Sequence, residues 1–320
     1  MADTLIEVRN LTKRFKTPKG TLHAVEGVSF FINKGETLGV VGESGCGKST
    51  LGRLLIKLTE PTSGTILFNG QDITQSAASL ALRRGMQMIF QDPYSSLNPR
   101  LSVRDIIAEP LQIHRVCAGR GETDARVAEL MDAVGLARRF ANAFPHELDG
   151  GRRQRIGIAR ALALGPELLV CDEPVSALDV SIRAQILNLL QDLQEERNIA
   201  YLFITHDMSV VKHISNEIAV MYLGRIVEKT GADALFEHTL HPYAKALLAA
   251  IPEPDIHKQR RPVLLRGEVA SPIDLPEGCS FAPRCPYAAE QCFRLTPVLE
   301  EVLPRHFAAC GRVREINALR

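Results

Sequence analysis

The chain has 320 residues, of which 45% are hydrophobic and 23% are charged, and its formal net charge is +1. This composition is typical of a folded protein, and the length suffices for one large core plus a smaller unit, or for two domains. The near-neutral charge and the aromatic content of 5% do not indicate a nucleic-acid surface. No stretch approaches the roughly eighteen consecutive apolar residues of a membrane span, and the N-terminus lacks the features of a signal peptide. Seven cysteines do not form a secreted disulfide pattern, so we expect a reducing cytoplasm, with other subunits holding the chain at any membrane where it works.

The first ninety residues alternate between short apolar runs and turns. A turn is predicted at Thr17–Gly20, and Phe15 lies in this turn region, where it would either cap the small core or stack on a purine. Another break is predicted at Glu60–Gly64. The predicted strands are Leu5–Val8, Val25–Ile32, Thr37–Val41, Thr65–Phe68 and Met86–Phe90.

A glycine-rich segment follows the apolar run Thr37–Val41 and fits the phosphate-loop pattern G-x-x-x-x-G-K-[ST]. Four leucines after it are spaced as one face of a helix. A strand, a glycine turn and a helix N-terminus together form an anion site, in which Lys48 would reach the outer phosphates and Ser49 would ligate Mg²⁺. A glycine turn that binds nothing is the alternative, and the Lys-Ser-Thr sequence with correct flanks favours a nucleotide site. The segment is Gly42, Glu43, Ser44, Gly45, Cys46, Gly47, Lys48, Ser49 and Thr50, and the leucines are Leu51, Leu54, Leu55 and Leu58.

The pattern becomes helical from Tyr94 to about Leu164, which predicts a helical subdomain inserted into the nucleotide fold. Glu167–Cys171 and Ala200–Thr205 return to short apolar runs typical of buried parallel strands. Between them an apolar helical stripe completes a strand–helix–strand alternation, which predicts an α/β fold with a parallel sheet. The stripe is Ile182, Ile186, Leu189, Leu190 and Leu193.

The C-terminal part begins with a predicted helix over Phe236–Ile251. Prolines then mark an irregular linker, and a small cysteine-bearing tail follows. The prolines are Pro252, Pro254, Pro262, Pro272 and Pro276.

Two acids end the strand predicted at Leu168–Asp172. Carboxylates at the carboxyl edge of a parallel sheet face the ligand crevice, so Asp172 suits Mg²⁺ and Glu173 could orient or deprotonate a water. Alone, a strand ending in two acids is a weak indication, because many such acids are simply solvated. His206 follows the next buried strand; a lone histidine there is more often structural, but its place at this edge favours a catalytic role.

At this point the chain resembles an ATP-binding subunit of an ABC transporter over nearly its whole length. Six motifs carry the resemblance: Phe15, Walker A at Gly42–Thr50, the loop glutamine Gln91, Walker B at Leu168–Asp172 with the catalytic Glu173, the D-loop Ser176–Asp179, and the switch histidine His206. The resemblance implies that Phe15 stacks on adenine, that Gln91 touches Mg²⁺ and senses the membrane subunit, and that His206 contacts the γ-phosphate.

The family signature Leu-Ser-Gly-Gly-Gln is altered here. The segment reads Leu148-Asp149-Gly150-Gly151-Arg152, and the resemblance implies that it opens a helix and contacts ATP bound by a partner subunit. Asp149 can still cap the helix. Against a phosphate it is unfavourable, because like charges about 4 Å apart repel by roughly 4 kcal/mol at a dielectric near 20, an effect that Arg152 would partly offset. We therefore expect a heterodimer with one active and one weakened site.

The C-terminal cysteines are separated by five, six and seventeen residues, which is not the C-x₂-C spacing of zinc sites. Buried thiols or an adventitious disulfide are the simple alternatives. The tail resembles that of dipeptide and oligopeptide importer ATPases, which share the His241-Pro242-Tyr243 and Arg284-Cys285 segments, and in several of which four cysteines hold a 4Fe–4S cluster. Four thiolates suffice for that cluster, which the resemblance favours over zinc. The residues concerned are Cys279, Cys285, Cys292 and Cys310.

The remaining cysteines near the predicted site differ from these four. Cys171 lies in an apolar strand and is expected to be a small core residue. Cys46 lies at a helix N-terminus, which predicts a lowered pKa and easy alkylation when ATP does not cover it, with no catalytic role.

The resemblance implies an ABC-type fold with a P-loop core, an N-terminal antiparallel β subdomain, the helical subdomain at about 94–164 and an irregular extension, divided into an ATPase domain at 1–235 and the extension at 236–320. It implies a peripheral ATPase on the cytoplasmic face of the inner membrane that drives import of di- or oligopeptides. The expected partners are a second ATPase, two membrane permease subunits and, indirectly, a substrate-binding protein. Nickel or glutathione import is the near alternative.

Other classes fit the sequence less well. Repair and chromosome ABC proteins insert long coiled coils or zinc modules between Walker A and the signature, whereas this interval has about one hundred residues without heptads. Translation ABC proteins carry two nucleotide units in one chain, and this chain has one. Glu173 and His206 argue against a module that binds ATP without hydrolysing it.

Overall fold

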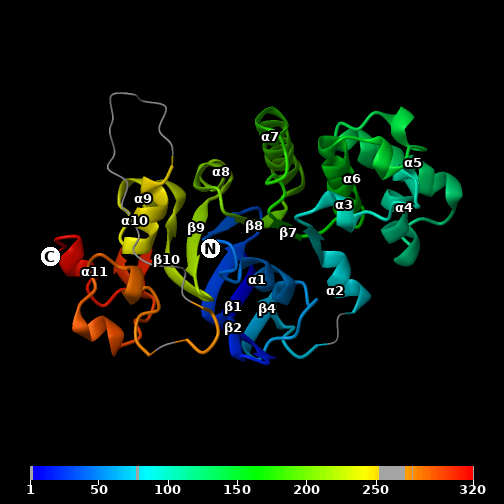
Figure 1. The fold of residues 1–320 in the computed structure, drawn as a ribbon. Helices are drawn as coiled ribbons and strands as arrows, with labels where there is room; N and C mark the ends of the chain where they lie inside the picture. Colours follow the sequence, from blue (N-terminus) through cyan, green and yellow to red (C-terminus); the bar gives the residue numbers. More distant parts are fainter. Residues whose placement is uncertain (1–2, 77–78, 252–270, 276, 320) are drawn as a thin grey trace, which may run out of the picture. The chain divides into compact units, whose positions relative to one another are not determined.

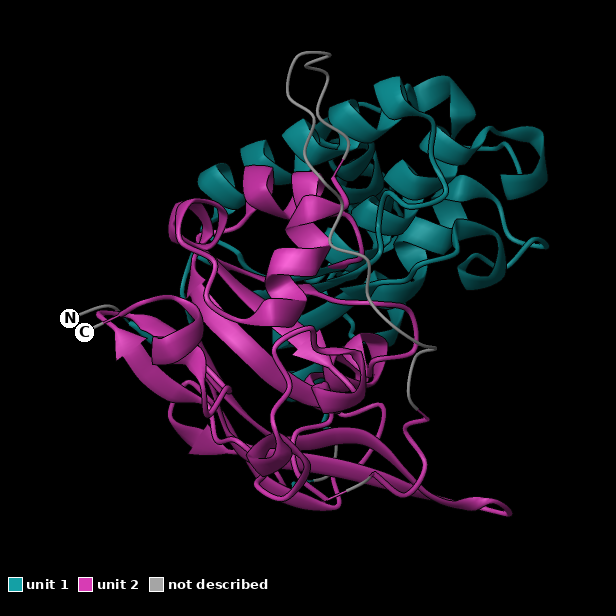
Figure 2. Cartoon of the chain, turned by 60° about the vertical axis from the view of Figure 1, so that its left-hand side comes forward, with its two compact units in different colours: residues 1–5, 32–36, 75–204 teal, residues 6–31, 37–74, 205–320 magenta. Residues whose placement is uncertain are grey.

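The computed structural model describes residues 3–76, 79–251, 271–275 and 277–319 (Figure 1). It contains two compact units: the first comprises residues 1–5, 32–36 and 75–204, and the second comprises residues 6–31, 37–74 and 205–320 (Figure 2). Of the predicted linker, Pro252, Pro254, Pro262 and Pro276 lie outside the described residues. In the part of the chain that is described, no helix is both long enough and apolar enough to cross a bilayer.

The first unit contains three parallel strands in the order β8 (Ala200–Thr205), β7 (Leu168–Asp172) and β6 (Met86–Ile89). Every residue of β7 and β8 is buried, as expected for strands covered on both faces. These strands confirm the short apolar runs predicted here, although β6 ends one residue before Phe90, which is 36% exposed.

Helices make up most of the rest of the first unit, and α3 to α6 lie together in Figure 1. Side-chain caps account for several of their starts: Ser102 accepts a hydrogen bond from the Asp105 amide at the start of α4, and Asp92 accepts one from Tyr94 at α3. The elements are α2 (Leu80–Gly85), α3 (Pro93–Ser96), α4 (Val103–Ile113), α5 (Arg120–Ala133), η1 (Arg138–Phe140), η2 (Pro145–Glu147), α6 (Gly150–Leu162) and α7 (Val180–Arg197).

Most of a four-stranded sheet of order β2-β1-β4-β5 belongs to the second unit. Its strands are β1 (Thr4–Thr17), β2 (Gly20–Asn33), β4 (Ser63–Phe68) and β5 (Gln71–Asp72), and β4 runs antiparallel to both β1 and β5. Phe15 lies within β1, so its predicted place in a turn is wrong: β1 extends to Thr17. Phe15 is 36% exposed and is not among the buried core residues.

The second unit also carries the strands β11-β12-β10-β9-β3 in that order. β3 (Thr37–Val41) pairs in parallel with β9 (Glu217–Tyr222), and the remaining pairs, formed by β10 (Arg225–Gly231), β12 (His306–Ala308) and β11 (Glu300–Leu303), are antiparallel. The C-terminal extension therefore contributes two strands to a sheet that includes β3, and it is more regular than its prolines indicate.

Two helix predictions in this unit need correction. Helix α1 (Lys48–Leu55) ends before Leu58, which is 53% exposed, because Lys57 adopts a left-handed backbone (φ 59°) and turns the chain. The single helix predicted over Phe236–Ile251 is two, α9 (Ala232–Glu237) and α10 (Pro242–Ala249), because His241 caps a new helix with a proline in its first turn. The other helices are α8 (Met208–Ile214), α11 (Val313–Ile316), η3 (Ala282–Arg284) and η4 (Glu290–Phe293).

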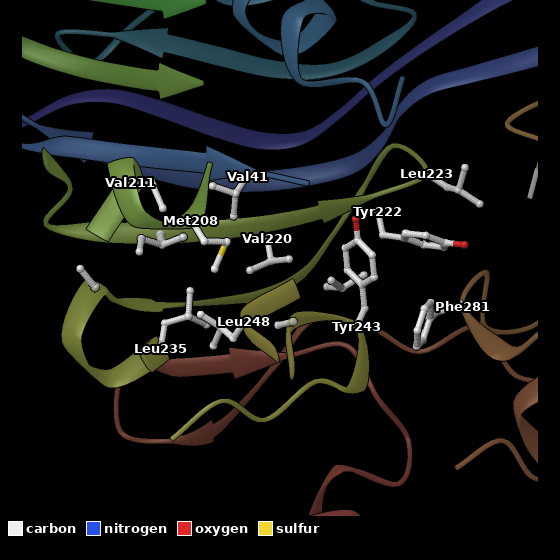
Figure 3. Close-up of a cluster of buried hydrophobic side chains, with 14 residues drawn as sticks. Val41, Met208, Val211, Val220, Tyr222, Leu223, Leu235, Tyr243, Leu248 and Phe281 are labelled. Atoms are coloured by element: carbon white, nitrogen blue, oxygen red, sulfur yellow. The ribbon is translucent and has the colours of Figure 1, made fainter. Parts of the chain in front are cut away.

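One buried cluster joins the extension to the strands of the second unit (Figure 3). Val41 of β3 and Val220 of β9 belong to it, together with three aromatic side chains. The ring centroids of Tyr222 and Tyr243 are 4.7 Å apart, and those of Tyr222 and Phe281 are 5.3 Å apart. The strand that precedes the phosphate loop thus shares its core with the C-terminal extension.

Candidate active site

The predicted phosphate loop connects β3 to α1 and needs glycine at two crowded positions. Gly47 has φ 107°, and a Cβ there would lie 1.9 Å from the carbonyl oxygen of Ala24. Gly42 has φ 155°, and a Cβ there would lie 2.1 Å from the carbonyl oxygen of Met221. Because no L side chain fits this backbone, the glycines of the motif are required by the path of the loop itself.

Lys48 begins α1 and is only 5% exposed. Its Nζ donates to the carbonyl oxygens of Gly42 at 2.8 Å and Glu43 at 3.0 Å, so the ammonium lies across the loop. A cation held there next to a helix N-terminus provides the positive potential that an anionic phosphate requires.

Cys46 does not behave as its position at a helix N-terminus predicts. It is 5% exposed, and burial raises the pKa of its thiol; the nearby Lys48 ammonium opposes this shift without overcoming it. The prediction of an easily alkylated thiol is therefore wrong, because desolvation of the thiolate outweighs the helix and lysine charges. Cys171 is buried in β7 with a raised pKa, which confirms it as a core residue.

In the first unit, Asp172 and Glu173 lie at the carboxyl edge of the parallel strands, as predicted, and Gln91 lies at the same edge. Asp172 is the last residue of β7 and is 3% exposed. Glu173 has a left-handed backbone (φ 47°), and its amide donates to the carbonyl of Ile204 at 2.9 Å. The Nε2 of Gln91, two residues beyond β6, donates to Oε2 of Glu173 at 3.2 Å. A non-glycine residue held at positive φ is strained, and such strain is commonly found at functional sites.

His206 is exposed and directly follows β8 in the chain. Lys48 and His206 belong to the second unit, and Asp172 and Glu173 belong to the first. The predicted convergence of these four side chains around one phosphate remains a prediction.

The altered signature starts α6, and Asp149 caps it as predicted. Its Oδ1 accepts a hydrogen bond from the Arg152 amide at 2.8 Å, and its Oδ2 pairs with the Arg152 guanidinium at 2.5 Å. That guanidinium also lies over the ring of Phe140, 4.9 Å from its centroid. The negative charge of Asp149 is therefore balanced within its own turn. Asp179 occupies the N-cap position of α7 and is exposed.

The four C-terminal cysteines line one cavity of about 120 Å³. All four are free thiols. Burial raises the pKa of Cys279 and Cys310, and it raises that of Cys285 to about 11 with a further contribution from the neighbouring thiols. Among residues 3–76, 79–251, 271–275 and 277–319, no three His, Cys, Asp or Glu side chains are arranged to bind one metal ion.

Two family models match this chain. One, described as ABC transporter, covers residues 25–176, and the other, described as oligopeptide/dipeptide transporter, C-terminal region, covers residues 227–292. The oligopeptide transport ATP-binding protein AppF of Bacillus subtilis is 50% identical over 322 residues, covering 96% of this chain and 97% of AppF. The chain belongs to the ABC transporter ATP-binding proteins. Escherichia coli OppF, an oligopeptide transport ATP-binding protein, is 49% identical over 311 residues, which cover 96% of this ABC protein and 93% of OppF.

Solved ABC cassettes share the fold. The dimeric structure of MJ0796, a bacterial ABC transporter cassette, matches with a TM-score of 0.65 and 31% identity, covering 71% of this ABC protein and 98% of MJ0796. The structure of cbiO1 from Clostridium perfringens matches with a TM-score of 0.64 and 28% identity, covering 74% and 92%. These matches confirm the predicted cassette fold, with its antiparallel β subdomain and helices. Together with the family models, they also confirm the assignment as an ATP hydrolase that uses ATP and Mg²⁺ and works with membrane permease subunits.

The sequence did not reveal two residues of this ABC protein that contact the phosphate loop. Arg284 forms an ion pair with Glu43, and Tyr243 accepts a hydrogen bond from the Glu43 amide. In the sequence, both belong only to the segments that carry the resemblance of the tail. No local pattern identifies them, because they lie 241 and 200 positions from Glu43 along the chain.

Proposed function

We propose that this ABC ATPase drives the import of di- or oligopeptides across the inner membrane, from a peripheral position on its cytoplasmic face. One observation carries the proposal: a phosphate-loop ATPase and the oligopeptide/dipeptide transporter C-terminal region occur in a single chain. The partners are two permease subunits, a second ATPase and, indirectly, a substrate-binding protein. Residues 1–235 form the ATPase domain and residues 236–320 the extension.

In the proposed site, the phosphate loop Gly42–Thr50 holds the phosphates, Lys48 neutralises the outer ones, and Phe15 stacks on adenine. Ser49, Gln91 and Asp172 hold Mg²⁺, which supplies charge neutralisation to the phosphates when bound. Asp179 of the D-loop also belongs to this proposed ATP site.

Hydrolysis in this proposal depends on Glu173. Its carboxylate takes a proton from a water whose oxygen bonds to the γ-phosphorus, while the bond from that phosphorus to the bridging oxygen breaks and ADP leaves. Gln91, which donates to Glu173, orients the carboxylate, and His206 stabilises charge on the γ-phosphate. The amide hydrogen bond from Glu173 to Ile204 helps to hold the backbone from which this carboxylate extends.

We infer further that the second ATPase makes the assembly asymmetric. The signature segment Asp149, Gly150, Gly151 and Arg152 would contact ATP bound by the partner, and it offers a paired carboxylate where the family has a hydroxyl donor. The Arg152 pair offsets part of the repulsion, but the hydrogen bond from the missing hydroxyl is not replaced. The composite site that uses Asp149 is thus the weaker one.

The cysteine cavity suits a 4Fe–4S cluster in this proposal, with Cys279, Cys285, Cys292 and Cys310 as its ligands. All four thiols line one cavity, and four thiolates are a sufficient ligand set for that cluster. Anaerobic purification that yields colourless protein without iron or sulfide would remove this proposal.

The central test uses the assembled transporter. Glu173→Gln is expected to abolish ATP hydrolysis while retaining ATP binding, and a strain lacking the chain is expected to lose uptake of a labelled tripeptide. Retained peptide uptake with lost nickel or glutathione uptake would instead support the alternative substrates. Failure to co-purify with permease subunits would contradict a transporter role.

A further inference from the structure

Glu43, the second residue of the phosphate loop, is held by the C-terminal extension. Its carboxylate accepts two hydrogen bonds from Arg284, from Nη1 to Oε2 at 2.7 Å and from Nη2 to Oε1 at 3.0 Å. Its amide donates to the hydroxyl of Tyr243 at 2.9 Å. The Arg284 side chain is 7% exposed and that of Glu43 is 27% exposed, so water screens the pair little.

The two residues that hold Glu43 are themselves fixed in the core of the second unit. Tyr243 is fully buried in the first turn of α10, and its ring packs against Tyr222 and Phe281 (Figure 3). Arg284 belongs to the turn η3, where its amide donates to the carbonyl of Phe281 at 3.0 Å. A displacement of Glu43 would therefore have to break buried contacts.

The backbone carbonyl of Glu43 also holds the phosphate loop and its lysine through hydrogen bonds. This carbonyl oxygen accepts from Lys48 Nζ at 3.0 Å and from the Cys46 amide at 3.3 Å. Glu43 is thus contacted from two sides: the extension holds its side chain and amide, and the phosphate loop with its lysine contacts its carbonyl. A shift of Glu43 would disturb its contacts with Lys48 and with the Cys46 amide of the phosphate loop.

We propose that Arg284 and Tyr243 are positioning residues of the ATP site, which hold Glu43 so that the phosphate loop keeps the conformation that binds nucleotide. The inference deepens the proposed function and rests on its ATP site. In this proposal the extension contributes to ATP affinity through two contacts with Glu43, the bidentate ion pair with Arg284 and the hydrogen bond to the Tyr243 hydroxyl. Arg284 directly precedes Cys285 in the chain, so the residue that pairs with Glu43 is the neighbour of a residue that lines the cysteine cavity.

The test measures binding of the fluorescent nucleotide mant-ATP to the full-length chain and to variants. Arg284→Met is expected to raise the Kd about tenfold, the change that corresponds to about 1.4 kcal/mol. Tyr243→Phe, which removes only the hydroxyl, is expected to raise it about threefold to tenfold. The matched control is Arg294→Met, which breaks an exposed ion pair with Glu290 in the same extension and is expected to leave the Kd unchanged.

A double-mutant cycle separates positioning from general stability. If Arg284 acts through Glu43, adding Arg284→Met to Glu43→Gln changes the Kd much less than it does in the parent chain. Arg284→Lys keeps the charge without the planar fork and is expected to restore part of the affinity, which a purely structural loss would not predict. If Arg284→Met does not fold, the Tyr243→Phe and Arg284→Lys variants decide the question.

Two outcomes overturn the inference: equal Kd values for the parent and for Arg284→Met, or equal losses for Arg284→Met and Arg294→Met. Failure of the parent chain to bind mant-ATP contradicts the proposed function instead, so the two failures are distinguishable.

Discussion

Cys46 lies at the start of a helix and next to a lysine, but its environment is governed by burial. Because burial raises its thiol pKa, little of it is thiolate at pH 8, and the thiol is also covered. We expect iodoacetamide to modify Cys46 of the native chain at least about tenfold more slowly than the partly exposed Cys117, as followed by peptide mass mapping. Equal rates in urea would serve as the control. Rapid native modification of Cys46 would contradict the buried position.

Asp149 and Arg152 form a pair whose charges cancel where the family has a serine and a glutamine. Replacing Asp149 with serine restores the hydroxyl donor and leaves Arg152 free to face a phosphate. We expect Asp149→Ser to raise the ATPase rate of the assembled complex by about threefold to tenfold, because one hydrogen bond to a charged group contributes about 1 kcal/mol or more. Arg152→Met, which leaves Asp149 unpaired, is expected to lower the rate. An unchanged rate in both variants would show that this signature does not limit turnover.

The predictable residues of the site are those whose roles depend on local sequence. The phosphate loop and the two acids at the end of β7 are contiguous motifs, so short sequence patterns predict the elements that carry them and their place at the edge of the sheet. Arg284 was missed because its partner Glu43 is distant in the chain. Phe15 was misplaced because a polar, exposed strand end resembles a turn in composition.

Helix α10 illustrates how a buried polar residue starts an element. The Nδ1 of His241 accepts a hydrogen bond from the Tyr243 amide, and the carboxylate of Glu228 accepts one from the His241 amide. Burial lowers the pKa of His241 from 6.5 to about 3, with a backbone hydrogen bond at Ala309 opposing the shift. The side chains at this cap include Glu228 and its hydrogen-bond partner His306.

This depressed pKa predicts a loss of stability in acid. Because the unfolded chain binds a proton near pH 6.5 and the folded chain does not until about pH 3, the unfolding free energy falls as the pH drops between these values. The slope due to His241 is at most about 1.4 kcal/mol per pH unit. We expect His241→Asn, which retains a capping oxygen, to show a shallower decline in urea unfolding between pH 6.5 and 4.5. Parallel declines would indicate that other groups control acid sensitivity.

Two glycines of α6 provide a matched pair. A Cβ at Gly151 would lie 2.7 Å from Cγ2 of Ile182 on α7, whereas a Cβ at Gly157 would meet nothing within 4 Å. We expect Gly151→Ala to lower the unfolding free energy by about 1–3 kcal/mol through overpacking and Gly157→Ala to raise it by about 0.5–1 kcal/mol through helix propensity. Urea denaturation measures both. Recovery in Gly151→Ala with Ile182→Ala would identify the clash as the cause, and a stabilising Gly151→Ala would contradict it.

Uniform apolar patterns predicted some strands correctly, but the apolar β9 was missed together with β10, which carries buried polar residues. β7 and β8 were correct because every position is covered and apolar residues dominate. β10 was missed because Glu228, Lys229 and Thr230 are buried in it, which obscures the pattern of a strand. The two charged residues have partners distant in the sequence, His306 for Glu228 and Glu217 for Lys229, and no local pattern reveals such partners.

At the scale of the whole molecule, the extension and the phosphate-loop strand belong to one core. Val41, Val220 and Tyr222 pack in the same buried cluster as Tyr243 and Phe281. The predicted boundary at residue 235 therefore divides the sequence but not the hydrophobic core, which contains residues from both sides of it. Cooperative unfolding of the second unit should follow, since a shared core cannot be lost from one part alone.

Two phenylalanines of the extension test this expectation. Phe281 is 2% exposed within the shared cluster, and Phe293 is 52% exposed. We expect Phe281→Ala to lower the unfolding free energy by about 3–5 kcal/mol and Phe293→Ala by less than about 1 kcal/mol, measured by urea denaturation. Because the cluster includes Val41 at the end of β3, nucleotide binding monitored with mant-ATP should be lost in the same transition as tyrosine fluorescence. If Phe281→Ala instead produced a separate early transition that left mant-ATP bound, the extension would be an independent module, and its contacts with Glu43 could not position the phosphate loop.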